Sequence, residues 1–318
     1  MSTSQASSGL ALEVKHLTKS FGSYPGVWDV SLSVKERTIH GFLGPNGSGK
    51  TTTIKCVMGL LRRTSGEIRI FGEELQGDGV ELKRRIGYLP EIPSYPTYLK
   101  GGEVLLTYGR MRGIKGSELL AQSKALLAQV GLTSDTGKPV GKYSKGMQTR
   151  LALAVALLGK PDLLILDEPT EGLDPVGVIG LREILKSLVS EGHSVLFSSH
   201  QLPEVQQMCS MVTVLKEGRT VTEGSVAELA KRLRGGVVYK AEFDSLGPGL
   251  LDDLKRVDGV SEVTSTEEDV VAILVSKDYD LRPSLARLAV HHGSLLLSCE
   301  RKEASLEELF ISLMKENS

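Results

Sequence analysis

Residues 44–51 read Gly44-Pro45-Asn46-Gly47-Ser48-Gly49-Lys50-Thr51, which is the pattern Gly-x-x-x-x-Gly-Lys-Thr. Glycines let successive backbone N–H groups turn inward around phosphate oxygens, while Lys50 supplies a positive charge and Thr51 a hydroxyl for Mg²⁺. Residues 38–43 are typical of a short buried strand, and residues 52–58 are typical of a helix whose N-terminus faces the anion. The sequence therefore predicts a phosphate-binding loop between a strand and a helix.

A pair of carboxylates follows an apolar run further along the chain. Residues 163–166, Leu-Leu-Ile-Leu, predict a buried strand that ends at Asp167 and Glu168. The apolar run argues against a pair of ordinary surface acids. Asp167 suits holding Mg²⁺, through Thr51 or a water, and Glu168 suits polarising the water that attacks the γ-phosphate of ATP. We therefore predict ATP hydrolysis with Glu168 as the base.

Composition excludes several classes of protein. The chain has 318 residues, 40% of them hydrophobic, which is enough for two packed domains. Its longest apolar run, residues 151–158, is far shorter than the roughly 20 residues that cross a bilayer. Residues 1–9 are Ser-rich and lack the features of a secretory signal, so we predict a disordered tail and a cytoplasmic protein. The formal net charge of −1 gives no broad basic field, and we expect no nucleic-acid partner.

Periodicity divides the first part of the chain into three regions. Alternating residues predict a small layer of antiparallel strands before the phosphate loop. A helical lobe is expected at about residues 92–160, and short apolar strands that alternate with a helix predict a parallel sheet. The expected strands are residues 12–15, 30–34, 163–166 and 195–197, and the expected helices are residues 103–111, 117–130, 176–188 and one that begins after Ser144.

Residues 236–318 predict a separate unit. Their pattern is strand, helix, strand, strand, helix, strand, which suggests a ferredoxin-like sandwich. A last helix is expected at residues 305–314 and presents one apolar stripe. This stripe is predicted to pack within the chain, on a second copy or on a different protein. Its members are Leu306, Leu309, Phe310, Leu313 and Met314.

Across residues 10–230 the motifs resemble, in order, those of the nucleotide-binding subunit of an ABC transporter. The resemblance implies an α/β fold at residues 10–235. Its P-loop NTPase core would contain a RecA-like parallel sheet and an antiparallel β layer, and a helical subdomain would be inserted in it. The α+β ferredoxin-like domain would follow at residues 236–318. ATP and Mg²⁺ are the implied cofactors. The implied partners are separate integral membrane permease subunits and a second copy or a paralogous ATPase subunit, which places the protein on the inner face of the cell membrane.

The resemblance also implies further site residues. Phe21 matches the aromatic residue that stacks on adenine, although Tyr24 and Trp28 are alternatives. Residues 143–150, Tyr-Ser-Lys-Gly-Met-Gln-Thr-Arg, resemble the family signature, whose Ser144 and Gly146 amide would contact the γ-phosphate bound to the opposite subunit.

Two more motifs complete the implied site. Asp174, in Glu-Gly-Leu-Asp, would line the shared interface, and His200 would sense the γ-phosphate. The full set of predicted site residues has three parts. The catalytic residues are Glu168, His200 and Lys50; the ATP-binding residues are Phe21, Gly44, Pro45, Asn46, Gly47, Ser48, Gly49, Lys50, Thr51, Thr52, Ser144, Gly146 and Asp174; the metal ligands are Thr51, Asp167 and Glu91.

The chain departs from the general family pattern at two places. Lys145 and Met147 replace the usual Gly and Gln of the signature, and Lys145 is unfavourable beside a helix N-terminus until a nucleotide is present. Glu91 replaces the usual Gln; its carboxylate can meet Mg²⁺, directly or through water, but repels the γ-phosphate. Both departures and the ending of the chain are similar to ATPases of type-2 ABC exporters of drugs and polysaccharides.

Two other functions fit parts of the sequence. A soluble regulatory or repair ATPase would use the same core to clamp a cytoplasmic protein or nucleic acid, but the sequence has no coiled-coil heptads or basic patch. A small-molecule phosphotransferase would share the phosphate loop but leaves residues 143–150 unexplained.

Overall fold

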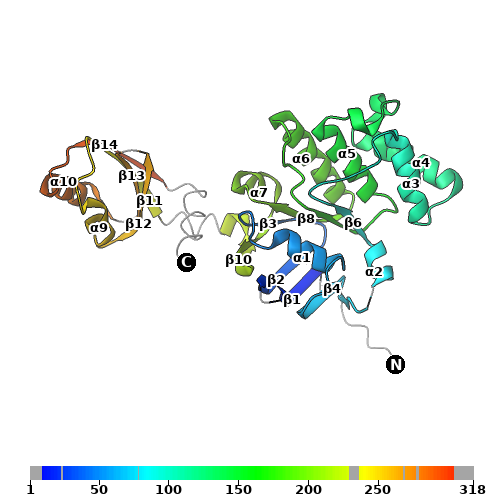
Figure 1. The fold of residues 1–318 in the computed structure, drawn as a ribbon, viewed down its shortest axis with the longest axis horizontal. Coiled ribbons are helices and arrows are strands. Elements are labelled where there is room, and N and C mark those ends of the chain that lie inside the picture. The colour runs from blue at the N-terminus through cyan, green and yellow to red at the C-terminus, as the bar shows by residue number, and fades with distance from the viewer. Residues whose placement is uncertain are drawn as a thin grey trace. The chain divides into compact units, whose positions relative to one another are not determined.

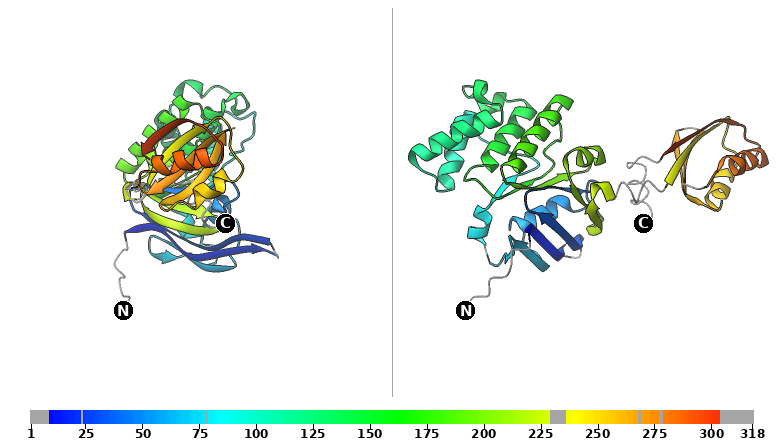
Figure 2. Two further views of the ribbon diagram at one scale, coloured as in Figure 1. Left: turned by 90° about the vertical axis from the view of Figure 1, so that its left-hand side faces the viewer. Right: turned by 180° about the vertical axis from the view of Figure 1, so that it is seen from behind.

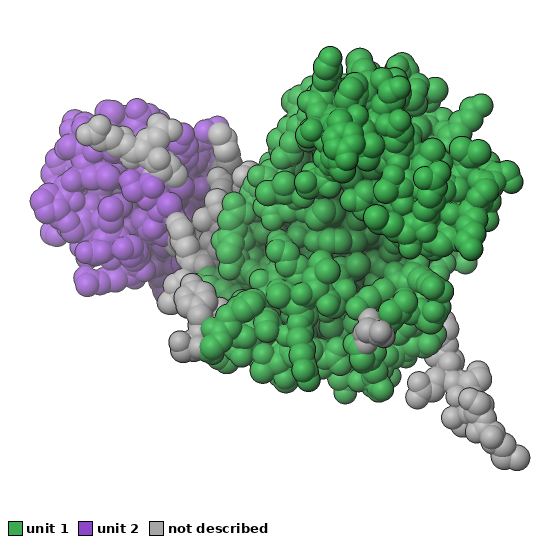
Figure 3. Space-filling model, turned by 45° about the vertical axis from the view of Figure 1, so that its right-hand side comes forward, with its two compact units in different colours: residues 1–226 green, residues 227–318 purple. Residues whose placement is uncertain are grey.

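The computed structural model describes residues 9–22, 24–77, 79–228, 236–267, 269–276 and 279–303. The chain forms two compact units, residues 1–226 and 227–318 (Figure 3). The helix expected at residues 305–314 lies outside the described residues, as does the expected tail up to residue 8. The expected boundary between residues 235 and 236 stays a prediction, because residues 229–235 also lie outside them.

A six-stranded sheet forms the centre of the first unit (Figure 1). Its strand order is β10-β9-β3-β8-β7-β6, and the pairs between β9 and β6 are all parallel, whereas β10 is antiparallel to β9. β3, β7 and β8 are buried along their whole length, as in a parallel sheet with both faces covered. The bounds are β3 Ile39–Leu43, β6 Ile86–Leu89, β7 Leu163–Leu166, β8 Ser194–Ser199, β9 Met211–Lys216 and β10 Arg219–Ser225.

A four-stranded antiparallel sheet forms a second layer, in the order β2-β1-β4-β5. Helix α1 packs between the two layers, and one cluster of buried side chains joins both sheets to this helix. The expected strands at residues 12–15 and 30–34 are confirmed as parts of β1 and β2, while β4 and β5 were not predicted. The bounds are β1 Leu10–Phe21, β2 Tyr24–Lys35, β4 Ser65–Ile70, β5 Glu73–Glu74, α1 Lys50–Val57 and α2 Val80–Arg84.

Helices α3, α4 and α5 gather into the expected lobe (Figure 2). The lobe is joined to the sheet by Arg112, whose Nη2 donates to the carbonyl oxygen of Ile86 at 2.7 Å and whose Nη1 donates to that of Leu158. Burial lowers the pKa of the Arg112 guanidinium. The helices are α3 Gly101–Met111, α4 Gly116–Gln129, α5 Lys145–Ala156, α6 Pro175–Ser190 and α7 Leu202–Met208, with 3₁₀ turns η1 Thr133–Asp135 and η2 Val140–Lys142.

The second unit has the predicted order of strands and helices. Its sheet runs β12-β13-β11-β14 with antiparallel pairs, and α9 and α10 pack against it around their own hydrophobic core (Figure 1). This topology confirms the ferredoxin-like prediction. The bounds are β11 Gly236–Phe243, α9 Leu250–Lys255, β12 Val260–Glu267, β13 Val270–Ser276, α10 Arg282–His291 and β14 Leu296–Glu303. Within the described ranges of both units, no helix is long and apolar enough to span a membrane.

Because the two units have separate cores, damage to one should leave the other intact. Tyr239 is fully buried on β11, and its hydroxyl donates to Asp280 Oδ1 at 3.2 Å. Tyr239→Ala should destabilise the second unit by about 3–5 kcal/mol, because it leaves a cavity. Hydrogen exchange measured by mass spectrometry should accelerate in residues 236–303 only. Val290→Ala, at a side chain that is 74% exposed, serves as the control. Equal acceleration in both units would contradict independent cores.

Candidate active site

The phosphate loop joins β3 to α1, as predicted. Gly47 and Gly49 have φ of +81° and +101°, a backbone region that other residues rarely adopt. Lys50 is buried, and its Nζ donates to the carbonyl oxygens of Gly44 at 2.7 Å and Pro45 at 3.3 Å. The loop therefore curls around the ammonium group of its own lysine.

Asp167 lies at the end of β7 and is fully buried. Its Oδ1 accepts hydrogen bonds from Thr51 Oγ1 at 3.3 Å and from Ser198 Oγ at 2.8 Å. Burial raises the pKa of Asp167; the two hydroxyl donors oppose this rise, and the charges of Glu91 and Glu168 add to it. Among the described residues, Oδ2 of Asp167 has no hydrogen-bond partner. The contact between Asp167 and Thr51 agrees with their predicted proximity.

Glu168 joins the loop to the end of β8. Its Oε1 forms an ion pair with Lys50 Nζ at 3.0 Å, and its Oε2 lies 2.9 Å from His200 Nδ1. The backbone of Glu168 has φ of +47°, and its N–H donates to Ser198 Oγ at 2.9 Å. Such a backbone conformation is costly for a non-glycine residue and is concentrated at functional sites. The structure thus brings all three predicted catalytic residues together.

A cleft of about 570 Å³ opens beside these groups. Phe21 lies on its wall, is 46% exposed and has Lys19 Nζ 4.9 Å from its ring centroid. Trp28 is not among the described residues that line the cleft, and the side chain of Tyr24 lies outside the described part of the chain. The lining residues are Phe21, Gly26, Asn46, Gly47, Ser48, Gly49, Lys50, Thr51, Thr52, Glu91 and Glu168.

The signature segment begins α5. Ser144 is the N-cap of this helix, and its Oγ accepts from Met147 N–H at 3.3 Å. Lys145 lies against Gly172 of the loop before α6. Asp174 is the N-cap of α6, and its Oδ1 accepts from Gly177 N–H at 2.7 Å.

The two N-caps stand apart from the phosphate cleft. Neither Ser144, Gly146 nor Asp174 is among the described residues that line the cleft of the same chain. The structure of one chain therefore does not bring them to its own phosphate loop.

Comparison with known proteins identifies the family. Residues 27–171 match the sequence family described as ABC transporter. The bacitracin transport ATP-binding protein BcrA of Bacillus licheniformis is 36% identical over 304 residues, which cover 95% of this chain and 97% of BcrA. The chain belongs to the ABC transporter ATP-binding family. Members of this family bind and hydrolyse ATP, so this ABC protein is an ATP hydrolase.

Two further comparisons support this assignment. The Nod factor export ATP-binding protein I of Burkholderia lata is 32% identical over 302 residues, covering 95% of this ABC protein and 96% of its relative. A solved ATP-binding subunit of an ABC transporter superposes with a TM-score of 0.63 at 29% identity, over 70% of this chain and 92% of that structure. The predicted family and fold are both confirmed.

Some polar contacts of this ABC ATPase were missed at the sequence level. Ser198 contacts both Asp167 and the backbone of Glu168. Ser199 Oγ and Thr170 Oγ1 each donate to Glu204 Oε2 at 2.7 Å, which ties the segment after β7 to the segment after β8. The run Ser-Ser-His at the end of an apolar strand could have indicated these contacts, because the polar ends of neighbouring parallel strands meet at one edge of the sheet.

The raised pKa of Asp167 predicts a pH-dependent stability. An acid with a higher pKa in the folded state binds more protons when folded, so stability falls as pH rises from about 4 toward the folded pKa. Asp167→Asn removes the buried charge. Without nucleotide or divalent cations, it should raise the free energy of unfolding at neutral pH, and the gain should shrink toward about pH 4.

Urea titrations over this pH range measure the difference between the two proteins. Asp174→Asn is the control, because Asp174 is exposed and Asn is an equally good N-cap. A lower free energy of unfolding for Asp167→Asn at neutral pH would show that the buried carboxylate does not destabilise the fold.

Proposed function

We propose that this ABC ATPase powers an exporter by ATP-driven, head-to-tail dimerisation on separate membrane permease subunits. The observation that carries the proposal is the contact of Glu168 with both Lys50 and His200, beside the Thr51 and Asp167 pair. The export activity named for the Burkholderia lata relative supports the direction of transport. The protein would act at the cytoplasmic face of the membrane.

The residues of the cleft fit ATP and Mg²⁺. Mg²⁺ prefers oxygen ligands, and the Thr51 hydroxyl lies beside Asp167, whose Oδ2 has no hydrogen-bond partner among the described residues. Thr51 and Asp167 would hold the ion, with Glu91 on the cleft wall as a third oxygen donor. When bound, Mg²⁺ would neutralise charge on the phosphates.

Lys50 and Glu168 would exchange partners when ATP binds. The triphosphate competes for the Lys50 ammonium, which then leaves Oε1 of Glu168 free to accept a proton from water. The resulting hydroxide attacks the γ-phosphorus, and the bond to the ADP oxygen breaks. His200 would hold Oε2 and keep the carboxylate oriented. Phe21 would stack on the adenine.

The signature segment would complete the site of a second copy. Ser144 and Gly146 stand at the N-terminus of α5, where the helix dipole favours an anion. In a head-to-tail dimer they would contact the γ-phosphate held by the opposite chain, with Asp174 at the interface. Loss of the γ-phosphate after hydrolysis removes this bridge. Closing and opening of the dimer would then move the permease subunits.

Replacing the proposed base tests the chemistry. Glu168→Gln should slow phosphate release by about 10²–10⁴-fold, because it removes the proton acceptor, while ATP still binds. Light scattering should also show an ATP-dependent dimer of this variant, and adding Ser144→Ala should return it to a monomer. Glu183→Gln, at an exposed acid on α6 that is not among the described residues lining the cleft, should hydrolyse ATP normally. Ordinary turnover in Glu168→Gln would refute the assignment.

Co-purification tests the coupling to transport. We expect tagged Glu168→Gln protein, extracted from its native membranes in mild detergent with ATP, to retain a polytopic membrane protein at comparable abundance. Mass spectrometry identifies that partner, and the Ser144→Ala double variant controls for contacts that do not need the closed dimer. Recovery with soluble proteins or nucleic acid alone would instead support the soluble regulatory ATPase.

A further inference from the structure

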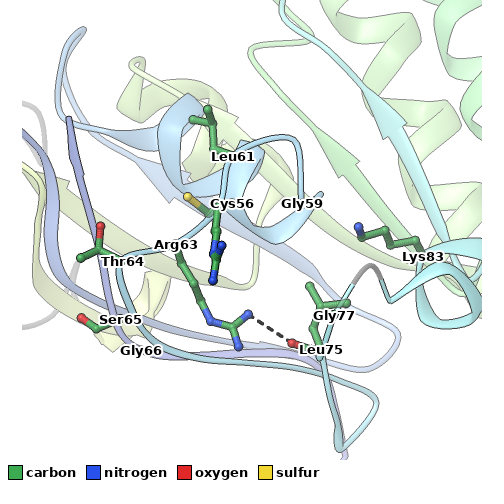
Figure 4. Close-up of a pocket in the computed structure, with 11 residues that line it drawn as sticks. Cys56, Gly59, Leu61, Arg63, Thr64, Ser65, Gly66, Leu75, Gly77 and Lys83 are labelled. Carbon is green, nitrogen blue, oxygen red and sulfur yellow. Dashed lines mark hydrogen bonds between the residues drawn. The ribbon is translucent and has the colours of Figure 1, made fainter. Parts of the chain in front are cut away.

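A second cleft, of about 730 Å³, lies where α1 ends (Figure 4). It shares none of its described lining residues with the cleft at the phosphate loop. Its walls come from the end of α1, the segment between α1 and β4, the start of β4, the segment after β5 and helix α2. The lining residues are Cys56, Gly59, Leu61, Arg62, Arg63, Thr64, Ser65, Gly66, Leu75, Gly77 and Lys83.

Three cationic side chains line this cleft, and none of its described lining residues is acidic. Arg63 is half-buried, and its Nη1 donates to the carbonyl oxygen of Leu75 at 3.1 Å, which fixes the guanidinium in place. Figure 4 shows this contact as a dashed line. Arg62 and Lys83 have no ion pair with any residue in the described ranges.

The side chain of Lys83 can reach across the cleft because the residue opposite it, Gly59, has no side chain. Its ammonium reaches from α2 to Gly59, where a Cβ atom would collide with Nζ. Gly59 has φ of +68°, so both its backbone and its missing side chain allow the approach. Lys83 is half-buried, and its ammonium has no anionic partner among the described residues.

Two positive charges, those of Lys19 and Arg63, act on Cys56 in the wall of the cleft. The thiol of Cys56 is unpaired and buried; burial raises its pKa, and the charges of Lys19 and Arg63 oppose that rise. The carbonyl oxygens of Lys55 and Cys56, at the end of α1, accept hydrogen bonds from the backbone of the following turn. Thr64 and Ser65 follow Arg63 along the wall of the cleft, and Thr64 Oγ1 accepts a hydrogen bond from Ser20 N–H at 3.1 Å (Figure 4).

We propose that this cleft binds a phosphate-bearing anion. Arg63 offers a fixed guanidinium, and Lys83 and Arg62 offer charges that lack partners in the described structure. Guanidinium and ammonium groups together form charge-assisted hydrogen bonds to phosphate oxygens. The chemistry suits either a free phosphate compound or the phosphate of a lipid headgroup, and none of the cations involved lines the cleft at the phosphate loop.

Titration calorimetry with inorganic pyrophosphate tests the site in the full chain. The titrations are run without nucleotide, and Lys50→Ala, which removes the ammonium group of the phosphate loop, identifies the part of the signal that comes from the first cleft. Lys83→Ala should weaken pyrophosphate binding by about tenfold, because it removes one charge-assisted contact, and Arg62→Ala should weaken it also. Arg84→Ala is the matched control, since Arg84 neighbours Lys83 on α2 but does not line this cleft.

Vesicles distinguish the two sources of phosphate. Flotation with phosphatidylglycerol vesicles, compared with phosphatidylcholine vesicles, should show binding that depends on Lys83 if the ligand is an anionic lipid headgroup. Pyrophosphate binding without such vesicle binding assigns the cleft to a free phosphate compound. Equal behaviour of Lys83→Ala and Arg84→Ala in both assays would overturn the proposal.

Discussion

The buried ion pair between Lys50 and Glu168 is the interaction on which the active site depends. β7 is apolar and fully buried, so it carries Asp167 and Glu168 to a place where both side chains are largely removed from water. Their charge is compensated by Lys50 from one side and by His200 and hydroxyl donors from the other. The need to compensate these two carboxylates therefore holds the phosphate loop, the end of β7 and the end of β8 together.

The two clefts of the first unit differ in how their cations are compensated. At the phosphate loop, Lys50 already has a carboxylate partner, so a triphosphate bound there would compete with Glu168 for the ammonium group. At the end of α1, Lys83 and Arg62 line the cleft without such a partner among the described residues. A ligand at the first cleft rearranges an existing ion pair, whereas a ligand at the second would supply a missing charge.

The sequence predicted the parts of the site that are contiguous in the chain. Residues 44–51 and the carboxylates after β7 are recognisable because apolar strands precede them. The contacts of Ser198, in contrast, depend on which neighbouring strand β8 pairs with and on side-chain direction, and neither is readable from a short run. The approach of Lys83 to Gly59 was equally hidden, because it joins the short helix α2 to the turn after α1, and neither segment is long enough to show a periodic pattern.

Arg112 attaches the helical lobe to the central sheet by two hydrogen bonds. Its guanidinium holds the carbonyl of Leu158, just after α5, and the carbonyl of Ile86, at the start of β6. α5 begins at the Ser144 cap, and β6 leads toward Glu91. A rotation of the lobe about this guanidinium would move the Ser144 end of α5 through a long arc while the end near β6 hardly shifts. One arginine thus links the end of the signature helix to the strand that precedes Glu91, so the two segments could not shift independently without breaking one of its hydrogen bonds.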